Sequence, residues 1–143
     1  MASFACENNV NSGVEAMDAQ RHKIFDCMST ICNLIADTHH NSDSIGGLLD
    51  QLEILCQIHY MDEEQLMEGV NYPLAAEHKR QHDLFLVTID QFKIDNKQCH
   101  TTSMLNDFIN IREDFITHML NETMLLSEFI NKISNGDSAT AAH

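Results

Sequence analysis

The chain has 143 residues, of which 43% are hydrophobic, so it is long and apolar enough for one folded domain with a sizeable core. Its formal net charge of −14 argues against nucleic acid or an anionic membrane as a partner. No apolar run approaches the roughly 18 residues of a membrane span, and the N-terminus lacks the pattern of a signal peptide. The five cysteines form no CxxC pair, so we expect reduced cysteines in a cytoplasmic protein.

Apolar residues recur at helical spacing in four blocks, and strand-like alternation is absent. These blocks cover about residues 17–35, 44–69, 73–92 and 105–133. Polar stretches separate the first block from the second and the third from the fourth, while Gly69 ends the second block. Pro73 suits the first turn of the helix that follows.

Four amphipathic helices joined by short links predict an all-α fold, an up-down-up-down four-helix bundle with a metal site in the bundle core. We expect a single domain over residues 1–143. Its bundle would cover about residues 15–133, preceded by an N-terminal arm at 1–14 and followed by a loose tail at 134–143.

Two pairs of polar residues, each one helical turn apart, face the predicted core. At 100° per residue, His59 and Glu63 lie near the middle of the apolar face of the second block. His78 and His82 flank the centre of the apolar face of the third block. Burying such groups without partners costs several kcal/mol each, and a metal ion supplies the missing compensation.

The fourth block adds two more candidate ligands. His118 lies toward one edge of its apolar sector, and Glu122 lies inside that sector. No cysteine joins these clusters, which argues against zinc–thiolate and iron–sulfur sites. Nitrogen-rich ligation with carboxylates suits a non-haem iron pair, and Glu63 is the candidate for a carboxylate that bridges two ions.

Four segments of the chain, GVEAMDAQ, HYMDEEQLM, NYPLAAEHKRQH and FITHML, resemble the helix signatures of the hemerythrin family, which includes the bacteriohemerythrins. The resemblance covers about residues 13–130 and implies a bundle that holds two bridged non-haem irons and binds O2 reversibly. It implies that one iron is bound by His78, His82 and His118. It further implies that His59 binds the other iron and that Glu63 bridges the two. The ligand pocket would be lined by Tyr60, Phe115 and Ile24.

The first block departs from the family pattern, which has DxQH where this chain has DAQRH. Aligned without a gap, Arg21 takes the position of a family ligand and His22 falls one residue late. Helical phase places Arg21 centrally on the apolar face, and His22 roughly 120° from the centre of that face. A local bulge would turn His22 inward as a ligand, whereas a regular helix would leave it on the flank.

The fourth block departs as well, since Thr123 stands where the family has a bridging aspartate. Glu122 is a substitute carboxylate ligand, a residue on the flank of the helix, or the partner of Arg21 in an ion pair. The iron implied at His78, His82 and His118 keeps all its nitrogen ligands, whereas the other iron loses its ligand from the first block, where the cation of Arg21 would repel a metal ion. The sequence therefore leads to the hypothesis of one firmly bound iron and a weak or altered second site.

These features predict a non-enzymatic, non-haem iron protein that binds O2 or a related small ligand such as NO or peroxide. Its role would be O2 binding, storage, transport or sensing, and no protein partner is indicated. Two alternatives stay open. One is an iron enzyme that consumes peroxide or NO, and the other is a bundle whose site is degenerate or metal-free and serves in protein interactions.

Overall fold

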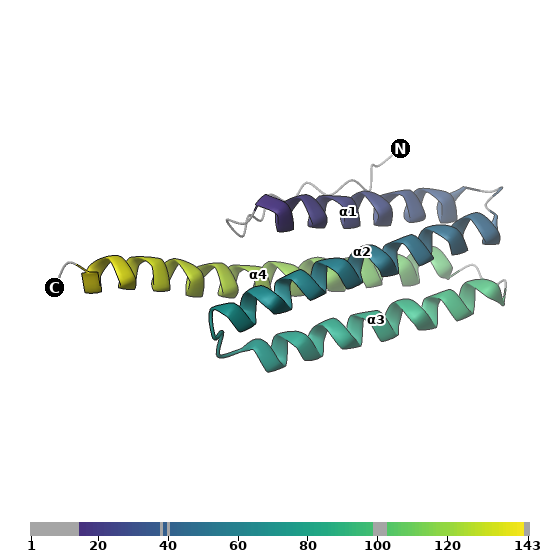
Figure 1. The fold of residues 1–143 in the computed structure, drawn as a ribbon. Helices are drawn as coiled ribbons and strands as arrows, with labels where there is room; N and C mark the ends of the chain where they lie inside the picture. The colour runs from purple at the N-terminus through teal and green to yellow at the C-terminus, as the bar shows by residue number, and fades with distance from the viewer. Residues whose placement is uncertain (1–14, 38, 40, 99–102, 142–143) are drawn as a thin grey trace.

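The structure, a computed structural model, describes residues 15–37, 39, 41–98 and 103–141. This part contains four α-helices and no strand (Figure 1). The helices are α1 (Glu15–Ala36), α2 (Ser42–Gly69), α3 (Ala75–Lys97) and α4 (Met104–Ala141). The predicted all-α, up-down-up-down four-helix bundle is confirmed, and a candidate metal site lies in its core. The arm predicted at residues 1–14 lies outside the described residues.

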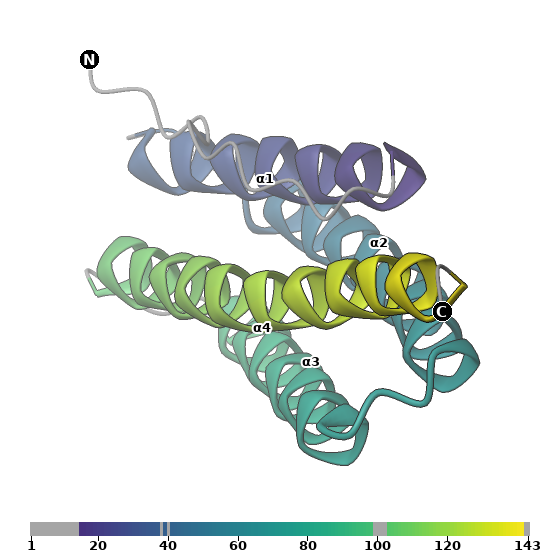
Figure 2. The same ribbon diagram turned by 90° about the vertical axis from the view of Figure 1, so that its left-hand side faces the viewer.

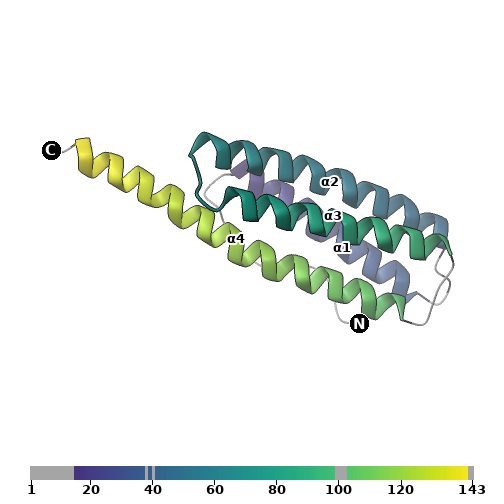
Figure 3. The ribbon, with the colours of Figure 1, turned by 90° about the horizontal axis from the view of Figure 1, so that it is seen from below.

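Each helix packs against two neighbours. Helix α1 contacts α2 and α4, and α3 contacts α2 and α4, so the four helices surround one shared core (Figures 2 and 3). This arrangement lets all four helices direct side chains toward the bundle axis. Within the described residues, no helix combines the length and hydrophobicity that crossing a bilayer requires.

The ends of α2 and α3 are fixed by polar side chains. Asn41 caps α2 by accepting hydrogen bonds from the backbone N–H groups of Asp43 and Ser44. Ser42 Oγ donates to the carbonyl of Asn96 near the end of α3, and Asn96 Nδ2 donates back to the carbonyl of Ser42, each at 3.0 Å. This reciprocal pair sets how far α3 lies along α2, and therefore which residues of the two helices face each other.

The core has two apolar clusters with a polar layer between them. The larger cluster fills the bundle toward the α1–α2 connection and includes the fully buried Ile24, Leu52 and Phe108. The smaller cluster, formed by Met67, Tyr72 and Leu126, lies toward the α2–α3 connection. Between them, α2 and α3 contribute buried charged and polar residues, and these form the candidate site.

Helix α4 is longer than expected from the sequence. It continues through Ala141, so residues 134–141 are helical where a loose tail was predicted. Figures 1 and 3 show this end of α4 projecting beyond the other three helices. Extending an existing helix costs little because each further residue adds one backbone hydrogen bond, whereas starting a new helix is unfavourable.

Candidate metal centre

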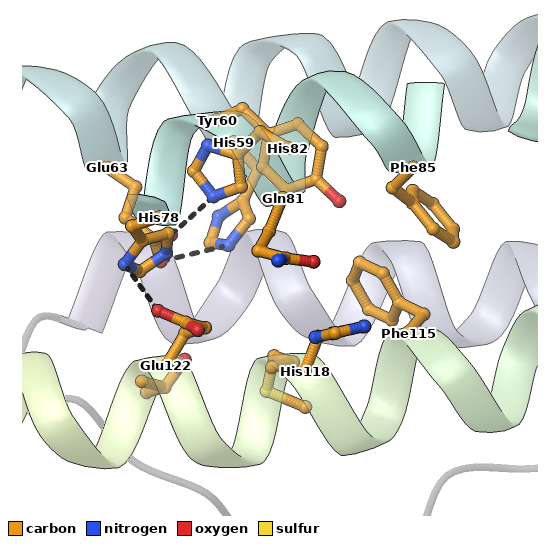
Figure 4. A pocket seen from close by; sticks show the side chains of 12 residues that line it. His59, Tyr60, Glu63, His78, Gln81, His82, Phe85, Phe115, His118 and Glu122 are labelled. Carbon is orange, nitrogen blue, oxygen red and sulfur yellow. Dashed lines mark hydrogen bonds and ion pairs between the residues drawn. The ribbon is translucent and has the colours of Figure 1, made fainter. Parts of the chain in front are cut away.

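A compact cluster of metal-ligand groups lies in the polar layer between α2 and α3. Among the described residues, Glu63, His78 and His82 are all buried and offer ligand atoms within 4.8 Å of one another. Glu63 Oε1 lies 2.5 Å from His78 Nε2 and 2.9 Å from His82 Nε2 (Figure 4). The two histidines reach the same oxygen because they are one turn apart on the face of α3 that packs against α2.

A second carboxylate lies on the outer side of each of these imidazoles. His82 Nδ1 is 2.9 Å from Glu64 Oε2, and His78 Nδ1 is 3.4 Å from Glu122 Oε2 without making a hydrogen bond in the described part of the chain. A neutral imidazole has one N–H group and one lone pair. A ring between two carboxylates therefore directs its lone pair at an anion unless a proton or a metal ion lies there. The donor set fits a metal bound at the inner nitrogens, with Glu64 holding the outer nitrogen of His82 and Glu122 facing that of His78.

The inner carboxylate is an anion at neutral pH. Burial by itself would raise the pKa of Glu63, but the hydrogen bonds from His78 and His82 outweigh burial, and the pKa of Glu63 falls below its usual range. Its side chain is 3% exposed. A buried carboxylate that stays ionised and points at two imidazoles is prepared to bind a cation.

His59 approaches the other oxygen of the same carboxylate. Its Nε2 lies 3.5 Å from Glu63 Oε2, and its Nδ1 lies 3.0 Å from Gln20 Oε1. The amide nitrogen of Gln20 donates to Asp62 at 2.6 Å, which orients the amide oxygen toward His59. Burial lowers the pKa of His59 to about 4. His59 is therefore neutral at pH 7, with its proton on Nδ1 and its Nε2 lone pair directed at the site.

Helix α1 contributes Arg21 rather than His22 to the interior. Arg21 is 2% exposed and pairs with Asp18, whereas His22 is exposed. Helix α1 is regular over its whole length, so the structure contains no bulge that would turn His22 inward. Burial lowers the pKa of Arg21, while the nearby charge of Glu63 acts in the opposite direction. Arginine nevertheless stays protonated in proteins, so this is a buried positive charge.

Helix α4 contributes less directly than the sequence suggested. His118 is exposed, and Figure 4 shows its ring beside Phe115 rather than directed at Glu63. Glu122 is half-buried and reaches the outer nitrogen of His78, not the cluster of inner ligand atoms. Thr123 is buried, at 2% exposure. The structure thus brings His118 and Glu122 to the edge of the site, and neither joins the three-residue group.

A small cavity of about 40 Å³ adjoins the cluster. Its lining residues are His59, Tyr60, Glu63, His78, Gln81, His82, Phe85, Phe115, His118, Met119, Glu122 and Thr123. Tyr60 stacks on His82 with ring centroids 3.8 Å apart, and Phe85 packs on Phe115 at 4.9 Å. Tyr60 and Phe115, which the family resemblance implied as pocket residues, both line this cavity. Ile24 is not among the lining residues and lies fully buried in the larger apolar cluster.

Five residues of the site were not identified from the sequence. Glu64 and Gln20 contact the outer nitrogens of His82 and His59, and Gln81, Phe85 and Met119 line the cavity. Glu64 follows Glu63 directly and Gln20 precedes Arg21, but helical phase places residues only relative to their own helix. Nothing in the sequence pattern specified which histidine each would contact.

Comparisons with known proteins agree with this geometry. The family model described as Hemerythrin HHE cation binding domain matches residues 12–130. The chain is 27% identical over 94 residues to a bacteriohemerythrin of Stenotrophomonas maltophilia and 25% identical over 96 residues to one of Pseudomonas paraeruginosa. Each of these matches covers 66% of this chain and 60% of the relative, so the chain spans less than two thirds of their length.

A third relative is matched over almost its full length. A bacteriohemerythrin of Clostridium acetobutylicum is 19% identical over 124 residues, which are 85% of this chain and 93% of the relative. No solved structure matches the chain. The family model covers most of the chain, including every residue of the cluster. The chain therefore belongs to the hemerythrin family, and this membership implies non-haem iron as its metal.

Proposed function

We propose that this chain binds O2, or a related small ligand such as NO or peroxide, at a non-haem iron centre inside the bundle. The observation that carries the proposal is the cavity of about 40 Å³ beside Glu63, His78 and His82. A single water needs roughly 10–15 Å³ on this measure, so the cavity has room for a diatomic ligand. Pockets for larger organic ligands are roughly 300 Å³ or more, which argues against such a substrate.

The buried donors divide into those that would hold the iron and those that orient them. Glu63, His78 and His82 would hold the ion through the inner oxygen and the two Nε2 atoms. Glu64 contacts the outer nitrogen of His82 at 2.9 Å, which fixes the orientation of that ring, and Glu122 faces the outer nitrogen of His78. When bound, ferrous iron supplies an open coordination position and an electron for a ligand such as O2.

The cavity walls protect the bound ligand from water. Tyr60 covers one face of the His82 ring, and Phe85, Phe115 and Met119 supply apolar surface around the space. His118 lines the cavity and is itself exposed, so it lies at the outer edge. Apolar walls disfavour entry of water and of charged solutes while admitting small uncharged molecules. In this proposal the ligand is bound and released, not turned over.

The test is reversible ligand binding by the iron-loaded protein. Metal-free protein is loaded with Fe(II) under argon, and its absorption spectrum is recorded before O2, after O2 and after O2 is removed again. The expected result is a spectral change that returns to the starting spectrum. The Glu63→Gln variant is expected to show no change, and Glu68→Gln, which alters an exposed glutamate on the same helix, should behave as the unmodified chain.

Two outcomes would overturn the proposal. One is a chain that takes up no iron, which would favour a metal-free interaction module. The other is consumption of O2, peroxide or NO over many cycles with no return of the starting spectrum. That result would assign the chain to iron enzymes, the second function considered from its sequence.

A further inference from the structure

We propose that this chain holds a single Fe(II) ion through Glu63, His78 and His82, and that Arg21 places a fixed positive charge where a second ion would otherwise bind. The inference rests on the iron centre of the proposed function. Beyond that function, it specifies how many iron ions the chain binds and names Arg21 as the residue that limits their number.

The three-residue group is by itself a complete site for one iron. Glu63, His78 and His82 provide one carboxylate and two imidazoles whose ligand atoms lie within 4.8 Å of one another. Two histidines and one carboxylate, with open positions for other ligands, are the donor set that proteins use for a single non-haem Fe(II). Both inner nitrogens meet the same oxygen, Glu63 Oε1, so one ion there would satisfy both rings.

The other side of Glu63 offers much less to a metal. His59 Nε2 lies 3.5 Å from Glu63 Oε2, and among the described residues no third His, Cys, Asp or Glu completes a group of ligand atoms with these two. Protein metal sites that keep an open position commonly supply three ligands, as catalytic zinc sites do. Gln20 and Asp62 are engaged behind His59, since the Gln20 amide joins the His59 ring to the Asp62 carboxylate.

Arg21 adds a charge that opposes a second cation on this side. It is 2% exposed, pairs with Asp18 one turn earlier, and directly follows Gln20, whose amide oxygen lies 3.0 Å from His59 Nδ1. A guanidinium cannot act as a metal ligand while it is protonated. Its positive charge repels a metal ion and stabilises Glu63 without one, because opposite charges interact strongly where water is excluded.

The stoichiometry of bound metal tests the inference directly. Metal-free chain is loaded with excess Fe(II) under argon and desalted, and iron per chain is measured by mass spectrometry. One ion per chain is expected. Two tightly held ions would overturn the inference and leave small-ligand binding intact, whereas a chain without iron would overturn the proposed function as well.

Substitution of Arg21 tests its role. Arg21→His replaces the charge with a ligand and is expected to raise the content to two ions. Arg21→Met removes the charge without adding a ligand and should bind a second ion more weakly than Arg21→His but more tightly than the unmodified chain, as measured by titration with Fe(II). Arg80→Met, which removes an exposed arginine of α3, should stay at one. A folded Arg21→His variant, as judged by circular dichroism, that still holds one ion would overturn the role assigned to Arg21.

A spectroscopic measurement on the unmodified chain keeps the inference testable if Arg21→His does not fold. After oxidation, an isolated high-spin ferric ion gives an electron paramagnetic resonance signal, whereas a coupled ferric pair is silent. We expect a signal that accounts for all bound iron. Bound ferric iron without a signal would overturn the inference.

Discussion

The two oxygens of Glu63 face environments that differ in how their charges are balanced. Oε1 faces α3, where each of two imidazoles lies between Glu63 and a second carboxylate. The negative charge there exceeds what the two neutral rings can balance. Oε2 faces His59 and the α1 side, where the buried Arg21, which is itself paired with Asp18, supplies a positive charge. A metal ion therefore binds where buried negative charge has no cationic side chain to balance it, and the number of ligands is only part of the reason.

Removing the carboxylate that both sides share should have the largest effect. Glu63→Gln keeps the size of the side chain but loses its charge and one donor oxygen. We expect the affinity for Fe(II) or Co(II) to fall more than about 100-fold, beyond the roughly 10- to 100-fold that loss of an outer partner costs. Isothermal titration under argon measures the affinity. Binding within about tenfold of the unmodified chain would show that Glu63 is not a ligand.

Substitutions of the residues behind His82 and behind His59 should affect metal affinity to different extents. Glu64→Gln removes the charge that faces His82 Nδ1, and we expect a loss of roughly 10-fold or more in metal affinity. Gln20→Ala removes the partner of His59 on the other side and should change affinity by less than about threefold, because no ion is bound there in our proposal. The same titration compares them. Equal losses for the two variants would place the ion between both sides.

The stability of the metal-free protein should depend on pH through His59. Its pKa is about 4 in the folded chain and near 6.5 when unfolded, so between these values the unfolded chain binds the additional proton. Stability is therefore expected to fall as pH falls from 6.5 toward 4, by on the order of 1–3 kcal/mol. Urea unfolding at pH 6.5 and 4.5 measures this change, at pH values where Glu63 still keeps its own charge.

His59→Gln is the matched test of that assignment. It keeps a polar side chain of similar size and cannot take up a proton, so the loss of stability between pH 6.5 and 4.5 should become smaller. An unchanged pH dependence in this variant would assign the effect to another group.

The smallest effect is expected at His22. Because its side chain is exposed, His22→Ala should leave the metal content unchanged and alter the free energy of unfolding by less than about 0.5 kcal/mol. Metal analysis and thermal unfolding check this. A loss of bound metal would show that the α1 side supplies a nitrogen ligand after all.

Much of the site follows from periodicity along single helices. His59, Glu63, His78 and His82 were placed in the core because pairs four residues apart share one helix face, and all four are buried. The same phase argument placed Arg21 inward. Helical phase could not show whether a side chain at the edge of the apolar face reaches the metal site. His118 and the outer partners of the histidines depend on side-chain rotamers and on how neighbouring helices are rotated, which no pattern within one helix specifies.

The fold was predictable for the same reason, and its errors lie at the ends. Four apolar stripes with short links leave few alternatives to a bundle. The residues after position 133 are polar and carry no apolar stripe, so their pattern did not favour a longer α4, although a helix that already exists extends at little cost.

The reciprocal hydrogen bonds between Ser42 and Asn96 act at a distance from the metal centre. They lie at the opposite end of the α2–α3 pair from the turn at Tyr72, and they help to hold the two helices in register. A slip of one residue would move His78 and His82 by about 1.5 Å relative to Glu63. Metal sites tolerate ligand distances to about 0.2 Å, so accurate ligand geometry at the centre depends on a hydroxyl and an amide several helical turns away.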